Sequence, residues 1–275
     1  MGCELKLKDR RLDLFAATPP LESLRFLCSL CASRQERRQP FRMLHVDVRR
    51  AYFYAAANRS IYNEIPVEDW EEGDENRVAQ LDLSLYGTRD AAQNWTEEYT
   101  KTFRDMGFTV GVASPCNFVH PDKELYVSVH GDDFTVVGPA SELEWMKSRL
   151  AKAYEIKAEF LGPAGGVYQS ELSIPNRTVR WTAHGLEYDA DQRHAELIIQ
   201  LAGVETGKPV AMPCCTDAEN DETKRLDSGA LVGTEATAYS EVAARLNFLA
   251  MDRTDLQYAA KEVAKHMANP CNLDS

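Results

Sequence analysis

The sequence has 275 residues, 44% hydrophobic and 27% charged, a composition that excludes a disordered chain, a collagen-like repeat and a membrane protein. No apolar run approaches the ~18 residues that cross a bilayer, and the N-terminus lacks the apolar middle region of a signal peptide. Seven scattered cysteines indicate reduced thiols rather than a disulfide framework. We therefore expect a soluble globular chain that nothing in the sequence directs to secretion.

Charge is unevenly distributed along the sequence. The net charge of −12 argues against general binding to nucleic acid. Residues 1–50 nevertheless contain eleven Lys and Arg against six Asp and Glu. A basic N-terminal segment therefore precedes an acidic body, and cationic contacts with a nucleic acid are expected from that segment.

The first predicted elements are a helix and a strand. Thr-Pro-Pro at residues 18–20 is typical of a helix start, with the threonine as cap, and apolar residues then recur at helical spacing through Cys28 and Cys31. This spacing favours a core-facing cysteine pair over a redox or zinc site, which would need further partners. Alternation over residues 42–48 predicts a strand with its even-numbered apolar residues on one face and Asp47 on the other.

The middle of the chain predicts a helix, a hairpin and a second helix. Residues 90–106 have an apolar helical face, with Asp90 as the cap. Residues 125–130 and 134–137 predict two strands around a tight polar turn, and a capping box that starts at Ser141 opens the next helix, before an extended segment. The order β-α-β-β-α-β predicts an α+β fold with a split βαβ, ferredoxin-like sheet and helices on one face.

The C-terminal part predicts smaller elements. They are a hairpin over residues 167–182 that turns at Pro175-Asn176, a helix over 191–203, an acidic loop near 204–236, and helices over 239–251 and 255–268.

Three carboxylates form the candidate site. Asp is uncommon in strands, so Asp47 is expected either to lie on an exposed face of its strand or to have a functional role. Asp132 and Asp133 in a turn are individually ordinary. A split βαβ sheet would, however, place the first strand beside the hairpin and bring Asp47 and Asp132 together at one end. Like charges that close need a counter-cation, and their hard oxygen donors suit Mg²⁺ or Mn²⁺. Two such ions can promote in-line phosphoryl transfer.

Several motifs together resemble the reverse transcriptase domain of copia-type LTR retrotransposons. The segment from Val46 to Phe53 is similar to that family's DVKxAF segment, and Ser84–Trp95, here called the Ser84–Trp95 block, is similar to its SLYGLKQAPRxW block. His130-Gly131-Asp132-Asp133 stands where the family has YVDD. Leu14–Ala32 resembles the helix before the first catalytic strand, and residues 238–270 resemble the stretch that precedes ribonuclease H.

The resemblance implies an RNA-directed DNA polymerase that uses two Mg²⁺ ions, with Mn²⁺ as a substitute. The implied catalytic residues are Asp47, Asp132 and Asp133, and the implied metal ligands are Asp47, Asp132 and the backbone carbonyl of Val48. The implied nucleotide-binding residues are Tyr52, Tyr86, Gly87 and Arg89. Tyr52 would act as a steric gate against ribose. The alternative role for Tyr52 is packing in the core, and the alternative for Arg89 is a solvent-exposed charge at the start of a helix. The nucleic-acid-binding candidates in the basic segment are Arg34, Arg37 and Arg38.

The resemblance also implies an organisation and partners. Residues 1–40 would hold part of the fingers and the leading helix, residues 41–165 the palm, and residues 166–275 a helical thumb or connection region. The implied partners are an RNA or DNA template with its primer, deoxynucleoside triphosphates, and the ribonuclease H and integrase regions of the same polyprotein, in cytoplasmic virus-like particles and without a membrane.

The sequence departs from the family at several positions. His130-Gly131 replaces an aromatic and an aliphatic residue before the Asp-Asp pair, and Thr88, Asp90 and Ala92 replace Leu, Gln and Pro. The chain also begins within the family's domain, without most of the fingers. A non-catalytic remnant that keeps the fold and binds nucleic acid or protein is therefore the alternative, and a metal-dependent cyclase is a weaker one that gives the Ser84–Trp95 block no role.

Overall fold

The computed structural model describes residues 16–74, 77–175, 177–207 and 229–272. It divides into two compact units. The first unit comprises Met1–Ile174 with Arg180–Glu187, and the second comprises Pro175–Val179 with Tyr188–Ser275. Each unit is described by itself.

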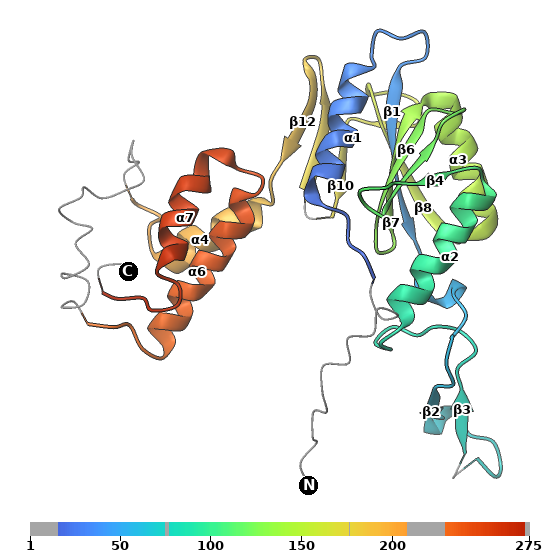
Figure 1. Ribbon diagram of the computed structural model, residues 1–275, viewed down its shortest axis with the longest axis horizontal. Coiled ribbons are helices and arrows are strands. Elements are labelled where there is room, and N and C mark those ends of the chain that lie inside the picture. Colours follow the sequence, from blue (N-terminus) through green and yellow to red (C-terminus); the bar gives the residue numbers. More distant parts are fainter. Residues whose placement is uncertain (1–15, 75–76, 176, 208–228, 273–275) are drawn as a thin grey trace. The chain divides into compact units, whose positions relative to one another are not determined.

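A seven-stranded sheet forms the centre of the first unit (Figure 1). Its strands, in the order in which they lie side by side, are β4 (Thr109–Val110), β5 (Asn117–His120), β6 (Leu125–His130), β7 (Asp133–Pro139), β1 (Phe41–Val48), β8 (Ile156–Leu161) and β9 (Tyr168–Gln169). The four central strands pair antiparallel, and β9 joins β8 in parallel. Taken in chain order, β1, β6, β7 and β8 occupy the 4-1-3-2 arrangement of a split βαβ, which confirms the predicted ferredoxin-like sheet.

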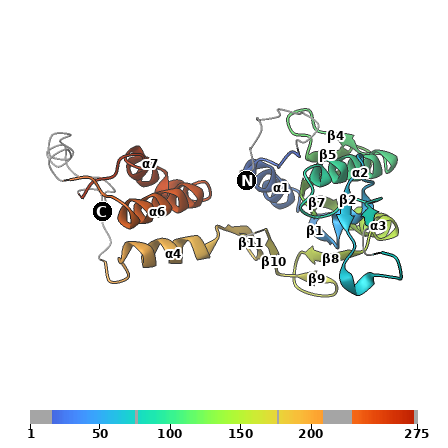
Figure 2. The same ribbon diagram turned by 90° about the horizontal axis from the view of Figure 1, so that it is seen from below.

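Helices cover both faces of this sheet. Figure 2 shows α2 (Ala91–Asp105) and α3 (Ala140–Ala153) on one side and α1 (Leu21–Ser33) on the other. The prediction of helices on one face was therefore incomplete, because α1 packs against β1, β6 and β7. Burial at almost every position of β1 follows from this double cover.

Aromatic side chains fill the core between the sheet and α2. Trp95, Tyr99 and Phe103 of α2 meet Phe118 and Phe134 of the sheet, with ring centroids 4.7–6.2 Å apart. Each side chain is at most 2% exposed. Burying a side chain of this size contributes about 1.5–3 kcal/mol, so this cluster is a major source of the unit's stability.

Two of the three predicted helix caps were wrong, and the third has the predicted position without the capping hydrogen bond. The N-cap residue of α1 is Pro20 and that of α3 is Pro139, so neither the threonine of residues 18–20 nor Ser141 caps a helix. Helix α3 begins directly after β7, which leaves Ser141 inside the helix. Asp90 is at the N-cap of α2 but does not cap it with its side chain; its Oδ2 pairs instead with Nε of Arg59 at 3.0 Å.

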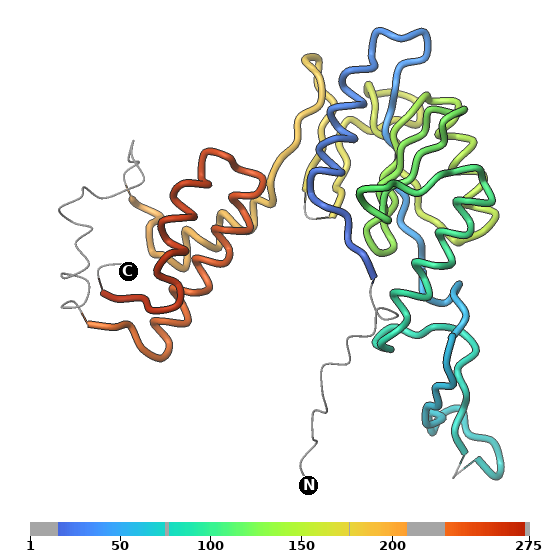
Figure 3. The backbone as a smooth tube through the Cα atoms, in the orientation of Figure 1, coloured from blue at the N-terminus to red at the C-terminus, as the bar shows by residue number. Residues whose placement is uncertain are grey.

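Between β1 and α2, the 3-10 helix η2 (Ala51–Tyr54) packs against α2, with Ala51 in the core. A small arm of the first unit follows, formed by strand β2 (Tyr62–Glu64), the 3-10 helix η3 (Val67–Asp69) and strand β3 (Val78–Gln80). The backbone tube in Figure 3 shows the β2–β3 pair extending away from the main sheet. The sequence did not predict this arm, because its strands are only three residues long and do not alternate between polar and apolar residues.

The remaining strands form a three-stranded sheet of β10 (Glu171–Ile174), β11 (Arg177–Thr182) and β12 (Gly185–Asp189). The predicted hairpin over 167–182 is thus divided, because β9 joins the large sheet and only β10 pairs with β11. Of its predicted turn, Asn176 lies outside the described residues.

Three helices make up most of the described part of the second unit: α4 (Gln192–Ala202), α6 (Thr234–Ala250) and α7 (Gln257–Lys265), with the 3-10 helix η4 (Thr254–Leu256) before α7. Helix α6 packs against α4 and α7. The acidic loop predicted near 204–236 ends earlier, because α6 starts directly after Gly233, whose φ is 61°. Residues 208–228 lie outside the described part of the chain. None of the helices described is long and apolar enough to cross a membrane.

Candidate active site

The predicted carboxylates meet at one end of the sheet. Asp47 near the end of β1 lies directly opposite Asp133, the first residue of β7. Asp132 precedes it in the hairpin tip, where its carbonyl accepts a hydrogen bond of 3.0 Å from the backbone N–H of Val48. The arrangement follows from the fold, because the first and third strands of a split βαβ sheet are neighbours.

The surroundings of Asp132 at this end of the sheet disfavour the deprotonated, negatively charged form of its side chain. Burial is the main cause that raises the pKa of its carboxyl group, and the nearby charges of Asp133 and Asp47 raise it further. Such a site is stabilised by a cation. The hard oxygen donors of Asp47 and Asp132 therefore fit a divalent metal ion in chemistry. In the described part of the chain, however, no group of three or more His, Cys, Asp and Glu side chains could hold a metal ion.

Two basic side chains that sequence reasoning missed lie beside the carboxylates. His45, two residues before Asp47 on β1, places its Nε2 3.2 Å from Oδ1 of Asp133. Lys157 of β8 is the cross-strand neighbour of Asp47 and forms an ion pair of 2.9 Å with Glu159. That ion pair is the main cause that lowers the pKa of Glu159. Alternation along β1 could have placed His45 on the face of Asp47, but Lys157 depends on the register of β8.

Tyr52 and Tyr86 form a stacked aromatic pair near the carboxylates. Their ring centroids are 4.3 Å apart at 28°. Burial raises the pKa of both hydroxyls, and the charge of Asp132 raises both further, which locates the pair beside the hairpin tip. Tyr52 packs partly against the core and is partly exposed, whereas Tyr86 is 47% exposed. Gly87 follows with φ of 91°, a conformation that favours glycine, and Arg89 is exposed just before α2.

The three predicted nucleic-acid-binding arginines do not lie with the carboxylates. Arg34, Arg37 and Arg38 are exposed between α1 and β1. They are thus at the start of β1, whereas Asp47 is near its end, a separation of about 20 Å at ~3.3 Å per residue. Arg37 also forms an ion pair of 2.6 Å with Glu124.

Polar contacts join parts of the Ser84–Trp95 block, connect it to Asn58, and link its last residue to the hairpin. Buried Asn94 donates a hydrogen bond of 3.0 Å to Oγ of Ser84 and accepts one of 2.7 Å from Asn58. Trp95 donates from Nε1 to the carbonyl of Gly131 at 2.9 Å. The helical pattern predicted that Trp95 faces the core, but it did not identify this contact with the hairpin.

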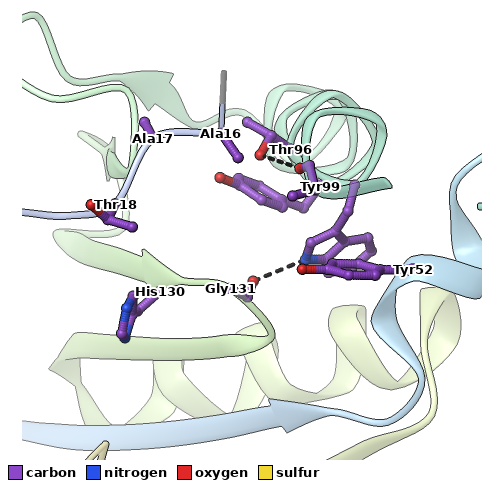
Figure 4. A pocket seen from close by; sticks show the side chains of 10 residues that line it. Ala16, Ala17, Thr18, Tyr52, Thr96, Tyr99, His130 and Gly131 are labelled. Atoms are coloured by element: carbon purple, nitrogen blue, oxygen red, sulfur yellow. Dashed lines mark hydrogen bonds between the residues drawn. The ribbon is translucent and has the colours of Figure 1, made fainter. Parts of the chain in front are cut away.

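A cavity of about 160 Å³ lies against the hairpin and α2. Figure 4 shows His130 and Gly131 on one side, Thr96 and Tyr99 of α2 on another, and residues 16–18 nearby. The two residues that depart from the family pattern before the Asp-Asp pair therefore line this cavity, and His130 is exposed.

Comparison with known proteins supports one family. Residues 7–167 match the family model described as "Reverse transcriptase (RNA-dependent DNA polymerase)". The chain is 22% identical over 266 residues to the "Retrovirus-related Pol polyprotein from transposon TNT 1-94" of Nicotiana tabacum, an alignment that covers 94% of this chain and 19% of the relative. It is 24% identical over 243 residues to the Retrovirus-related Pol polyprotein from transposon RE2 of Arabidopsis thaliana, covering 86% of this chain and 15% of the relative. The chain thus spans less than a fifth of the length of these relatives.

Among solved structures, telomerase from Candida albicans in complex with a fragment of telomeric RNA aligns with 92% of this chain and 45% of its own, at 9% identity and a TM-score of 0.37. A TM-score this low does not establish a common fold.

Proposed function

Because the chain belongs to the reverse transcriptase (RNA-dependent DNA polymerase) family, we propose that it is the polymerase segment of a retrotransposon Pol polyprotein and extends a primer on an RNA or DNA template. One observation carries this proposal: Asp47 of β1 lies opposite the Asp132–Asp133 tip of the β6–β7 hairpin. The copia-type resemblance is consistent with the transposon relatives. A cyclase is disfavoured, because the Ser84–Trp95 block contacts this hairpin.

Asp47 and Asp132 are the proposed metal ligands, with the carbonyl of Val48 as a further donor. The raised pKa of Asp132, caused by burial and then by its neighbouring carboxylates, supports a need for cations there. Two Mg²⁺ ions, when bound, would activate the primer hydroxyl and stabilise the leaving pyrophosphate. Asp133, held near His45, would support the site without binding both ions.

The stacked pair of Tyr52 and Tyr86 is the proposed floor for the sugar of the incoming deoxynucleotide. Its position beside Asp132 supports this role, because the triphosphate would bind the same metal ions. Gly87 allows close approach of the backbone to the nucleotide, and exposed Arg89 can contact the template or the nucleotide.

Template binding would extend away from the carboxylates. Arg34, Arg37 and Arg38 are proposed to contact phosphates, so that neutralising them should weaken binding and reduce its dependence on salt. Residues 41–165 would act as the palm, residues 1–40 as part of the fingers, and residues 166–275 as the thumb or connection region. The ribonuclease H and integrase partners and the cytoplasmic particle follow from the same proposal.

Primer extension tests the proposal. Extension of a DNA primer on an RNA template by the 275-residue chain should require Mg²⁺ or Mn²⁺. Asp132→Asn should abolish it without unfolding the protein, because it removes a ligand charge. Asp133→Asn should have a smaller effect. Asp122→Asn is the matched control, since Asp122 is an exposed residue at the opposite end of β6.

A second outcome would favour the non-catalytic remnant. Two observations support this alternative: no described group of three metal-binding side chains, and His130-Gly131 before the carboxylates. The remnant hypothesis predicts no extension with either metal ion by the folded wild-type chain. Extension by wild type that persists in Asp132→Asn would instead contradict the proposed role of that residue.

A further inference from the structure

Three consecutive residues of the β6–β7 hairpin tip are each held from outside the turn. Gly131 accepts a hydrogen bond from Nε1 of Trp95 at 2.9 Å, drawn as a dashed line in Figure 4. The carbonyl of Asp132 accepts one from the backbone of Val48, and the carboxylate of Asp133 lies 3.2 Å from His45. Val48 and His45 belong to the neighbouring strand β1. Trp95, in contrast, belongs to helix α2.

The indole of Trp95 is fixed in direction. Its side chain is 1% exposed. Its ring lies parallel to Phe134, within 7°, and meets Tyr99 and Tyr154 edge to face at 5.5 and 5.2 Å. Rotation of the ring would break these contacts, so its N–H group is held toward the hairpin. A buried donor of this kind constrains its acceptor, because an unpaired indole N–H would be costly.

We propose that Trp95 is a positioning residue that fixes the hairpin tip, and with it the carboxylate of Asp132, through its indole N–H group. The carbonyl of Gly131 belongs to the peptide that joins it to Asp132, so displacement of this carbonyl also turns the backbone of Asp132. The adjacent φ of Gly131, 67°, lies in the region where glycine has no side-chain penalty. The hydrogen bond from Trp95 therefore restricts a backbone conformation of the tip that the glycine alone leaves free. This proposal deepens the proposed polymerase function and rests on it for the role of Asp132.

The test removes the N–H group and keeps the ring. Replacing Trp95 with 3-benzothienylalanine by amber suppression retains a bicyclic aromatic of nearly the same shape and deletes the donor. Trp95→Phe is a simpler second variant. Tyr154→Phe is the matched control, because it deletes a hydrogen bond of 2.7 Å from the same aromatic cluster whose partner is Thr102 of α2 rather than the hairpin.

Hydrogen exchange of the peptide over residues 128–135 gives the readout that does not depend on activity. Both Trp95 variants should exchange about tenfold faster there, the change expected for loss of one hydrogen bond worth about 1.4 kcal/mol. Tyr154→Phe should exchange at the wild-type rate in this peptide. Unchanged exchange in the benzothienylalanine protein, or an equal rise in the Tyr154 control, would overturn the proposal.

Mn²⁺ binding then tests whether the carboxylate itself is positioned. The component of Mn²⁺ affinity that Asp132→Asn abolishes should weaken about three- to tenfold in the Trp95 variants and stay unchanged in Tyr154→Phe. Faster exchange with unaltered Mn²⁺ affinity would show that the tip is held without positioning Asp132, and would also overturn the proposal. If the wild-type chain has no such Mn²⁺ component, the proposed metal function fails, and hydrogen exchange alone decides whether Trp95 fixes the tip.

Discussion

Replacing Asn94 with alanine should loosen the connection between the Ser84–Trp95 block and the segment after η2. Asn94 is 5% exposed and makes two side-chain hydrogen bonds, to Ser84 at 3.0 Å and from Asn58 at 2.7 Å. Each such bond contributes about 0.5–1.5 kcal/mol net. Ser84 keeps a bond to the carbonyl of Ala56 at 3.2 Å, and Asn58 is exposed to water. Both of these partners therefore keep another hydrogen bond or contact with water, so the expected loss is about 1–3 kcal/mol.

Urea unfolding followed by tryptophan fluorescence measures this loss. All four tryptophans belong to the first unit, so the signal reports on the unit that contains Asn94. Gln93→Ala is the control, because this neighbouring side chain makes a hydrogen bond of 3.0 Å to Glu97 at the exposed surface. It should change the free energy of unfolding by less than about 0.5 kcal/mol. Equal losses in the two variants would refute the conclusion that Asn94 ties these segments together.

Three further changes have defined outcomes. The pKa values of Cys28 and Cys31 are raised from 9.0 to about 12 by burial, so their stabilising effect is complete below pH 9 and is lost as pH rises through 12. In urea titrations above pH 9, the free energy of unfolding should fall by up to about 1.4 kcal/mol per pH unit for each thiol. It should fall less steeply in the variant in which both cysteines are replaced by alanine. Arg177→Met should destabilise the second unit by about 3–5 kcal/mol in far-ultraviolet circular dichroism melts, because Asp252 is 1% exposed and loses its guanidinium partner at 2.9 Å; Arg193→Met, at an exposed ion pair, should cost less than about 1 kcal/mol. Tyr52→Val should raise the ratio of kcat/KM for ribo- over deoxyribonucleotides by roughly 10–200-fold, whereas an unchanged ratio would assign Tyr52 to core packing.

Sequence periodicity predicted the elements that place the carboxylates. Alternation indicated β1, and the polar turn at Asp132–Asp133 indicated the β6–β7 hairpin. The order of strands and helices then sufficed to make these neighbours, because the ferredoxin-like connection leaves the third strand beside the first. The meeting of Asp47 with the hairpin could therefore be predicted without knowing any side-chain contact.

The contacts that refine the site depend on tertiary structure. An apolar helical face predicted that Trp95 is buried, but its polar atom finds a partner only once α2 is docked over the hairpin. Lys157 became a neighbour of Asp47 through the register of β8, which no local pattern specifies. The sequence also could not predict which face of the sheet α1 covers. An amphipathic pattern shows which side of a helix is buried, but it does not identify the surface against which that side packs. The prediction of Ser141 as a cap failed because Pro139 leads straight from β7 into α3.

Anomalous diffraction from crystals of the chain with primer–template, an incoming deoxynucleotide and Mn²⁺ would test the central claim most directly. The proposed function predicts two Mn²⁺ peaks about 3.5–4 Å apart, both bound by the carboxylates of Asp47 and Asp132. Nucleic acid bound in crystals that have no Mn²⁺ peak at these two carboxylates would contradict the two-metal polymerase and support a binding protein that has lost catalysis.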